Sequence, residues 1–512
     1  MIEIHSIVEA VFQHAQRQPE RPAISFAEQS WNYGKLCAEI ERFAQALRVW
    51  GLLSGDRVAL FLENCPAFVV AYLGTHLAGG IVVLVNTQYQ QVELSHILTD
   101  AGVRLCVTSS VGVQALLPLE LPDLTALVVG DGTASPSPTG SSEIIAFADF
   151  MMRGGGGKLA MPKAEASAVI GYTSGTTGRS KGALLSHRNF VANVEAVTTA
   201  WKWTENDHLL LALPLFHTHG LMVGMHGTLY TGARVTLRPK FETADILARL
   251  HADPSITLFF GVPTMYARLV KEAEKQGVPA HLPRLFVSGS APLSSQLFSD
   301  FERLFGQTLL ERYGMTETIM NLTNPYDGER RAGSVGGPFP GQEARIVDVR
   351  TRRLLPAGEI GEIEVRGPHV FCGYWKRPEA SAEAFEPDGW FKTGDLGRCS
   401  ADGYYTITGR AHELIISGGY NVYPREVEDV LGSHPDSAEV AVIGLPDSDF
   451  GEQVVAVIVP REGRTPNEAE IIAFCRERLA SYKKPRRIIF ARTLPRNALG
   501  KVQKHLLVEQ VQ

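Results

Sequence analysis

The residues whose types and spacing are best suited to chemistry form a polar loop between Tyr172 and Gly182. The loop reads Tyr-Thr-Ser-Gly-Thr-Thr-Gly-Arg-Ser-Lys-Gly; it follows an apolar run at 168–171 and precedes a helix expected from His187. Its glycines let backbone amides turn toward an anion, its five Ser and Thr hydroxyls add donors, and Arg179 and Lys181 add positive charge. The loop therefore predicts a binding site for a triphosphate.

This loop differs from the Walker A motif of motor-type nucleoside triphosphatases. In that motif the lysine follows a glycine and precedes a Ser or Thr. Here Lys181 follows Ser180 and precedes Gly182. A motor-type enzyme is therefore disfavoured.

Three histidines, His217, His219 and His226, are close enough in sequence to raise the question of a metal site. The stretch 216–232 that contains them has no Cys, Asp or Glu to complete a ligand set. We therefore expect no zinc here.

Composition and charge limit the function classes. A chain of 512 residues with 45% hydrophobic and 20% charged residues is typical of a globular enzyme with two or more domains. The net charge of -6, without a long Lys/Arg block, argues against nucleic acid as a partner. Six widely spaced cysteines indicate reduced thiols and a cytoplasmic location.

No targeting or membrane segment is expected. The N-terminus lacks a basic region followed by an apolar run, so it does not resemble a signal peptide. The apolar stretch 68–85 is interrupted by Thr75, His76, Gly79 and Gly80. A buried helix that leads into a buried strand explains this stretch better than a membrane span.

The elements that must position the loop alternate between helix and strand. Helical periodicity covers 6–17 and 32–50, whereas 57–62 and 81–85 are short apolar runs typical of buried strands. This rhythm predicts an α/β fold with mostly parallel sheets covered by helices. The Ser-, Pro- and Gly-rich stretch 134–163 is expected to be a surface loop.

The pattern changes after about residue 410 to a compact α+β segment. Helices are expected over 424–431 and 471–479, and strands over 440–443 and 454–459. We therefore expect a large N-terminal domain over 1–409, a connection over 410–413 and a small C-terminal domain over 414–512.

Six motifs, read together, resemble those of the adenylate-forming superfamily, which includes acyl-CoA synthetases, peptide-synthetase adenylation domains and beetle luciferases. They occur in the family's order and span nearly the whole chain, which is far more specific than any one motif. The motifs are Tyr172–Gly182, Pro214–Gly220, Tyr313–Glu317, Thr393–Gly397, Gly409–Asn421 and Pro495–Lys501. The resemblance implies an ATP-dependent acid–thiol ligase that forms an acyl-adenylate and then an acyl-CoA thioester, with Mg²⁺ and coenzyme A.

The resemblance also implies roles for individual residues in nucleotide binding. It implies that the aromatic ring of Tyr313 packs on the adenine. It implies that Asp395 and Arg410 bond the ribose hydroxyls, for which a carboxylate and a guanidinium are good partners. It also implies that Glu317 binds Mg²⁺, a cation that prefers oxygen ligands. The other residues expected to bind ATP or AMP are Thr173, Ser174, Gly175, Thr176, Thr177, Gly178, Lys181, Ser290, Ala291, Pro292, Gly314 and Thr316.

Lys501 corresponds to the family's lysine that bridges the carboxylate and the α-phosphate. Adenylation is an in-line attack at phosphorus, so a cation between nucleophile and phosphoryl oxygen stabilises the developing negative charge. Lys501 is therefore expected to be the main catalytic residue. Further catalytic roles are expected for Glu317, Thr177 and His217.

In this family the small C-terminal domain is a mobile lid that turns between the two half-reactions. One pose brings Lys501 to the site, and the other brings Ser417, Gly418 and Gly419 toward the pantetheine tunnel for coenzyme A. The hinge position, usually Asp or Lys, is His412. Because histidine titrates near neutrality, the rotation is expected to have an unusual pH dependence.

The resemblance is closest to the malonyl-CoA synthetase group, through residues 216–221, 261–268 and 315–321. In that group the arginine matching Arg268 is expected to face the distal carboxylate, with His217 at the mouth of the acyl pocket and Met320 also in contact with the acid. A buried carboxylate needs a cation, and a guanidinium can hold it in a bidentate manner.

Three alternatives stay open at this stage. A purely apolar pocket around Arg268 would favour a short- or medium-chain acyl-CoA synthetase. A carrier-protein-loading adenylation domain usually needs an acidic group for the substrate ammonium, and 216–232 has none. A nucleotide-binding regulator without turnover would not require both Glu317 and Lys501. The oligomeric state is open.

Overall fold

The computed structural model describes residues 4–131, 142–155, 157–173, 180–417, 420–448, 450–496 and 502–511, and only the backbone of His412 and Asn421. The predicted site residues outside this description are Ser174, Gly175, Thr176, Thr177, Gly178, Gly418, Gly419 and Lys501.

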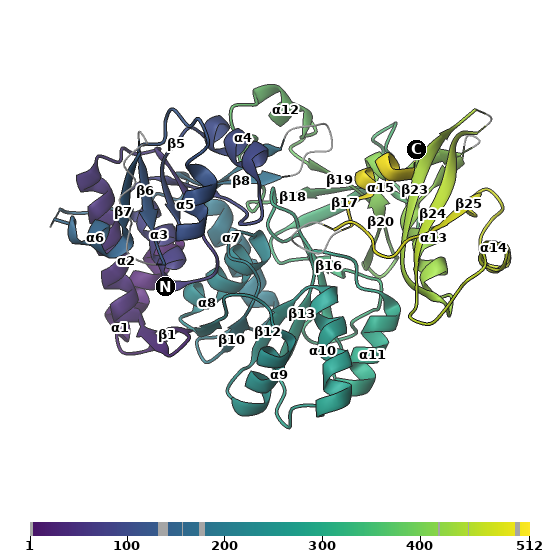
Figure 1. The fold of residues 1–512 in the computed structure, drawn as a ribbon, viewed down its shortest axis with the longest axis horizontal. Coiled ribbons are helices and arrows are strands. Elements are labelled where there is room, and N and C mark those ends of the chain that lie inside the picture. Colours follow the sequence, from purple (N-terminus) through teal and green to yellow (C-terminus); the bar gives the residue numbers. More distant parts are fainter. Residues whose placement is uncertain are drawn as a thin grey trace.

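A seven-stranded sheet forms one half of the N-terminal region (Figure 1). Its spatial order is β7-β6-β5-β3-β4-β8-β9, and every pair is parallel except the hairpin β8–β9. The strands are β3 (Arg57–Phe61), β4 (Ile81–Leu84), β5 (Val103–Thr108), β6 (Ala126–Val129), β7 (Glu143–Ala146), β8 (Ser167–Thr173) and β9 (Lys181–Ser186).

A nine-stranded sheet forms the other half, in the order β16-β15-β14-β13-β12-β10-β11-β1-β2. Its central strands are parallel, and its two ends are antiparallel. The strands are β1 (Pro22–Phe26), β2 (Gln29–Asn32), β10 (His208–Leu211), β11 (Arg234–Leu237), β12 (Leu258–Gly261), β13 (Leu285–Ser288), β14 (Leu310–Tyr313), β15 (Leu322–Thr323) and β16 (Gly337–Pro338).

Helices lie between the two sheets and on both outer faces. The inner set comprises α1 (Ile7–Arg17), α2 (Tyr33–Trp50), α3 (Pro66–Leu77), α6 (Phe147–Met152), α7 (His187–Ala200), the π-helix η1 (His219–Met225) and α8 (His226–Thr231). The outer helices are α4 (Gln91–Ala101) and α5 (Ser110–Leu116) on the seven-stranded sheet, and α9 (Thr243–Ala252), α10 (Pro263–Gln276) and α11 (Ser295–Phe305) on the nine-stranded sheet.

The alternation of side chains along each strand explains these layers. Val58 and Leu60 of β3 join the central core, whereas Ala59 and Phe61 join the core under α4 and α5. Successive side chains of a strand point to opposite faces, so an apolar strand supplies two cores at once. The same alternation in β10 divides its leucines between the central core and the core under α9 to α11.

Two smaller sheets follow. An antiparallel four-stranded sheet contains β17 (Glu343–Val347), β18 (Gly361–Arg366), β19 (Phe391–Cys399) and β20 (Tyr405–Arg410), with α12 (Pro378–Glu383) beside it. The lid contains a five-stranded sheet and three helices after the 3-10 turn η2 (Ala411–Glu413). These are β21 (Ile415–Ser417), β22 (Tyr420–Val422), α13 (Pro424–Gly432), β23 (Ser437–Asp447), β24 (Gly451–Pro460), α14 (Glu468–Arg476), β25 (Arg487–Phe490) and α15 (Lys504–Val511).

Most expected helices and strands are confirmed. They could be predicted because local sequence signals mark their boundaries. Ser6 caps α1 through the amide of Glu9 at 3.1 Å, and Asn32 caps α2 through the amide of Lys35 at 2.8 Å. Gly51 ends α2 in the left-handed conformation with φ of 101°. Residues 68–85 form most of α3 and then β4, and all of them except Gly79 are buried.

Two expectations are wrong in detail. The stretch 134–163 was expected to be a loop, yet it contains β7 and α6, because Ile145, Phe150 and Met151 reach the apolar core. Helix α14 ends at Arg476, three residues before the expected Leu479. No helix in the described ranges is long and apolar enough to cross a membrane.

Candidate active site

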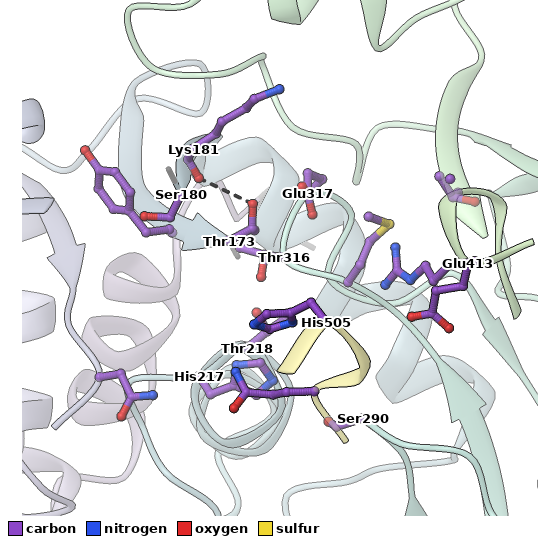
Figure 2. Close-up of a pocket in the computed structure, with 18 of the residues that line it drawn as sticks. Thr173, Ser180, Lys181, His217, Thr218, Ser290, Thr316, Glu317, Glu413 and His505 are labelled. Carbon is purple, nitrogen blue, oxygen red and sulfur yellow. Dashed lines mark hydrogen bonds between the residues drawn. The ribbon is translucent and has the colours of Figure 1, made fainter. Parts of the chain in front are cut away.

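A cavity of about 1890 Å³ lies where the lid meets the N-terminal region, and it collects most of the described site residues (Figure 2). Thr173, Lys181, His217 and Glu317 come from the N-terminal region. His505 enters from the lid helix α15. Concave sites with a few convergent polar groups are the usual setting for a ligand.

The phosphate loop is the turn of the antiparallel hairpin β8–β9. Thr173 ends β8 and donates a hydrogen bond to the carbonyl of Lys181 at 3.4 Å, and both residues line the cavity. The ammonium of Lys181 lies 5.4 Å from the ring centroid of Tyr374. The described residues on either side of the turn therefore line the cavity, and residues 174–179 lie outside the described part of the chain.

The three residues expected to hold adenine and ribose are brought together. Asp395 on β19 pairs with Arg410 on β20 at 2.7 Å, and the two residues are direct cross-strand partners. The hydroxyl of Tyr313 donates to the other oxygen of Asp395. Arg410 lines the cavity, whereas Tyr313 and Asp395 are buried next to it.

Glu317 lies in a strained turn that lines the cavity. Its carboxylate accepts a hydrogen bond from the hydroxyl of Tyr374 at 3.1 Å, and burial raises the pKa of this carboxyl group. Ile319 has φ of 60°, which is rare for a β-branched residue, and such strain is concentrated at functional sites. Thr316 and Gly314 line the same wall. A Cβ at Gly314 would lie 2.0 Å from the carbonyl oxygen of Ile319, so the turn requires glycine there.

The residues present suit a magnesium ion held by few protein groups. No cluster of three or more His, Cys, Asp or Glu side chains that could hold a metal occurs among the described residues. Mg²⁺ is commonly bound by one or two carboxylates together with phosphate oxygens. Glu317, beside the phosphate hairpin in the cavity wall, meets that requirement.

The opposite wall of the cavity consists of η1 and the segment before it. His217 and Thr218 precede η1 and line the cavity together with His219. The Nδ1 atom of His219 lies 3.3 Å from the hydroxyl of Ser290, whose φ of 68° is unusual outside glycine. A π-helix at this point is in keeping with their frequent occurrence at functional sites.

Burial keeps both histidines neutral. The pKa of His217 is lowered to about 4, by burial first and then by the charge of Arg312. The pKa of His219 is lowered well below its usual value for the same two reasons, and its Nε2 atom is buried without a hydrogen-bond partner among the described groups.

Arg312 is the cation at this end of the cavity. It follows Glu311 on β14, is 3% exposed and lines the cavity beside His217 and His219. Its Nε and Nη2 atoms are buried and have no hydrogen-bond partner within the described part of the chain. Burial lowers its pKa to about 9, which leaves the guanidinium charged at neutral pH.

Arg268, which was predicted to face the acid, does not line the cavity. Helix α10 turns the stripe of Tyr266, Leu269, Val270 and Ala273 toward the core, and Arg268 falls on the exposed opposite face, away from the cavity.

Two other arginines, Arg330 and Arg331, are already bonded to other groups. Arg330 donates to the carbonyls of Thr308, Pro325 and Tyr326. Arg331 pairs with Glu329 and Asp402.

The remaining predicted residues lie as follows. Ser290 and Met320 line the cavity, whereas Ala291 and Pro292 do not. Ser417 is buried in β21 away from the cavity lining. Val502 and Gln503, which directly follow Lys501, do line it. The described residues that follow Lys501 therefore lie at the cavity.

Sequence reasoning missed Arg312, Tyr374 and the lid residues of α15. A signal for Arg312 was present, because Glu311 and Arg312 interrupt the apolar run Leu309-Leu310 just before a motif. Charged residues in a buried strand are costly and mark functional candidates. Tyr374 and His505 reach the cavity through the tertiary fold, and this left no local signal in the sequence.

Two family descriptions match the chain. The AMP-binding enzyme family matches residues 11–375, and the AMP-binding enzyme C-terminal domain matches residues 426–501. Together they cover both sides of the cavity.

Relatives and solved structures match the chain along nearly its full length. The chain is 34% identical to malonate–CoA ligase of Arabidopsis thaliana over 99% of this chain and 89% of that protein. It is 35% identical to a long-chain-fatty-acid–CoA ligase of Bacillus subtilis over 97% and 93% of the two chains. ATP-bound MatB from Rhodopseudomonas palustris superposes with a TM-score of 0.91 at 38% identity, covering 99% of each chain. The apo form of MatB gives a TM-score of 0.79 at 37% identity over the same shares of the chains.

Proposed function

The chain belongs to the AMP-binding enzyme family and is an ATP-dependent CoA ligase, and on that premise we propose that its acid is malonate or a related small dicarboxylate. The observation that carries this proposal is the buried guanidinium of Arg312, with two nitrogen atoms unpartnered among the described residues. The similarity to malonate–CoA ligase and to MatB agrees with it.

The energetics of Arg312 favour an anionic partner. A charged group taken out of water without a partner costs several kcal/mol, so such groups are normally paired. A second carboxylate on the acid, placed beside this guanidinium, would lower the penalty by pairing its charge. The alkyl end of a monocarboxylic acid would leave the penalty in place, which makes the pocket selective for a dicarboxylate.

In the first half-reaction, one carboxylate oxygen attacks the α-phosphorus of ATP, the bond to the β-phosphate oxygen breaks and pyrophosphate leaves. The hairpin turn and Lys181 would hold the triphosphate, and Tyr313, Asp395 and Arg410 would hold the adenosine. Glu317 would bind Mg²⁺, which neutralises charge on the phosphates. Lys501 would stabilise the charge that develops between nucleophile and phosphorus.

In the second half-reaction, the sulfur of coenzyme A attacks the acyl carbon and its proton is released. The bond between the acyl carbon and the bridging oxygen breaks, and AMP leaves with that oxygen, which came from the acid's carboxylate. The lid would turn about His412 to bring Ser417, Gly418 and Gly419 toward the thiol. The higher TM-score with ATP-bound than with apo MatB supports the view that the arrangement described here is the one for adenylation. The boundaries proposed for the two domains remain 1–409 and 414–512, around this hinge.

A second candidate is a ligase for fatty acids, which have a single carboxylate and an uncharged alkyl chain. The Bacillus subtilis relative is as similar to this chain as the malonate–CoA ligase is, so identity alone does not choose the acid. Met222, Ile319 and Met320 also give the cavity apolar surface. Arg312 is the feature that separates the two candidates.

The test is pyrophosphate release and CoA-thioester formation with ATP, Mg²⁺ and a series of acids. Malonate should give the highest kcat/KM, followed by methylmalonate, and then acetate, propionate and hexanoate. A preference for hexanoate over malonate would contradict the dicarboxylate proposal and leave the ligase activity intact.

Gly289 offers a sharper test of the same proposal. A Cβ at this position would lie 2.5 Å from the Cζ atom and 2.6 Å from the Nε atom of Arg312. Gly289→Ala should therefore displace the guanidinium and lower kcat/KM for malonate relative to propionate. If the ratio of the two values is unchanged, the distal carboxylate binds elsewhere.

A further inference from the structure

Helix α4 holds the phosphate hairpin at both of its strands. Before the turn, the hydroxyl of Tyr172 donates to the Oδ2 atom of Asp100 at 2.7 Å. After the turn, the Nε2 atom of His96 lies at hydrogen-bonding distance, 3.0 Å, from the carbonyl oxygen of Ser180. His96 and Asp100 are one helical turn apart on α4, so one rigid element contacts both ends of the loop.

Asp100 also holds the segment 371–377, which covers the open edge of β9. Its Oδ1 atom accepts from Arg377 at 2.6 Å. Its main-chain carbonyl accepts from the indole of Trp375 at 3.3 Å and from Lys376 at 2.9 Å. Asp100 is thus shared by the helix, the hairpin and this covering segment.

The covering segment connects Asp100 to the catalytic groups. The amide of Trp375 donates to the carbonyl of Gly182 at 2.7 Å, and the amide of Leu184 donates to Gly373 at 2.9 Å, so the segment pairs with β9. In the same segment Tyr374 donates to Glu317 and lies next to the ammonium of Lys181. A shift of the segment would therefore move the proposed phosphate and magnesium ligands together.

The placement of Asp100 is not explained by the stability of α4. It lies in the last turn of the helix, where the macrodipole disfavours a negative charge. Its carboxylate is nevertheless 13% exposed and bonded on both oxygens to groups outside the helix. Burial and the bond to Asp100 raise the pKa of Tyr172, so its hydroxyl remains a donor at any ordinary pH.

We infer that Asp100 is a positioning residue for ATP, which acts through Tyr172 and Arg377 to fix the phosphate hairpin against α4, with His96 fixing its far strand. The inference does not depend on which acid the enzyme uses. It predicts an effect on ATP that is separate from any effect on the acid or on stability.

The experiment measures the KM values for ATP and for the acid, together with the thermal midpoint, in the full-length protein. Asp100→Asn keeps the shape and removes the charge, so the KM for ATP should rise about tenfold while the KM for the acid stays within about twofold. Tyr172→Phe, which deletes one hydroxyl, should raise the KM for ATP by a smaller factor. The double variant should be no worse than Asp100→Asn alone, because both changes break one interaction.

Asp56→Asn is the matched control. The Asp56 side chain is 14% exposed and pairs with Arg104 at 2.5 Å, much as Asp100 pairs with Arg377, but its bonds within the described part of the chain do not reach the hairpin. It should lower the thermal midpoint without a change in the KM for ATP. Two results would overturn the inference: an equal rise in the KM for ATP in Asp56→Asn, or an unchanged KM for ATP in Tyr172→Phe and Asp100→Asn. If Asp100→Asn fails to fold, Tyr172→Phe alone decides.

Discussion

The two ends of the cavity are built in opposite ways. At the proposed nucleotide end (Tyr313, Glu317, Tyr374, Asp395 and Arg410) each polar side chain is already bonded to another. At the proposed acyl end (His217, His219, Ser290, Arg312 and Met320) Arg312 and His219 keep buried nitrogen atoms without partners among the described residues.

This difference indicates how stability and specificity are divided. A paired network is organised before substrate arrives and suits a step that is common to all acids. Unpaired buried groups cost stability, and only a ligand with complementary oxygens recovers that free energy. The nucleotide end should therefore contribute to stability, and the acyl end should reduce it.

The largest expected effect concerns the lid, because its Lys501 is proposed to act where the acid and the nucleotide react. Lys501→Ala should slow acyl-adenylate formation by about 100- to 1000-fold, because it removes a cation from the transition state. Thioester formation from preformed adenylate should change much less. Rapid-quench measurement of each half-reaction checks this, and equal losses in both would assign Lys501 a structural role.

Arg312→Met tests the acyl end directly. If the distal carboxylate loses a buried partner, about 2 to 5 kcal/mol of binding is lost, which lowers kcat/KM for malonate by about 30-fold or more. Activity with acetate and propionate should hold or rise. Because the variant removes an unpaired buried charge, its free energy of unfolding should stay equal or increase.

Arg268→Met is the control for that change. Its side chain is exposed on α10 and outside the cavity, so malonate activity and stability should both resemble the unmodified protein. A strong loss of malonate activity in this variant would restore the original prediction from sequence and contradict the assignment of Arg312.

Asp395→Asn tests the nucleotide end. The substitution weakens both the ion pair with Arg410 and the bond from Tyr313, so the free energy of unfolding should fall by about 1 to 3 kcal/mol. The KM for ATP should rise by about tenfold, with the ranking of acids unchanged. Urea titration and steady-state kinetics measure the two effects. A gain in stability would remove the contrast between the two ends.

The smallest effect is a pH dependence at the acyl end. The pKa of His219 is lowered in the folded protein, so the unfolded chain binds more protons below its ordinary value near 6.5, and stability falls as pH decreases through that value. Between pH 7.5 and 5.5 this one group should account for about 1 kcal/mol. His219→Asn should reduce the pH-dependent loss by that amount in urea titrations, and the same change at the exposed His251 should not.

Much of the fold was predictable because its signals are local. Caps at Ser6, Asn32 and Ser186 and the glycine at 51 mark helix ends in the sequence itself. Apolar runs such as 57–62 predicted buried parallel strands for the same reason. Helix α6 was missed because its burial depends on contacts with distant Phe43, which no local pattern records.

The site residues also divide into those that local motifs predict and those that depend on tertiary structure. Residues inside dense motifs were predicted correctly as neighbours: Glu317 and Arg410 line the cavity, and Asp395 is paired with Arg410. Arg268 and Arg312 show what sequence motifs alone cannot predict. Arg268 ends one motif and Arg312 directly precedes another, so both were equally plausible from the sequence. The structure turns Arg268 on α10 to solvent and Arg312 on β14 inward.

The layers described for the fold have a consequence for cooperativity. The two large sheets share one central core, from Ile7 through Tyr405, so they should lose structure in a single transition. The lid has two cores of its own, built from residues 415–488 and 441–507, and meets the rest across the cavity. It is therefore suited to open and re-form as a separate cooperative unit, with faster amide exchange than the sheets that it covers.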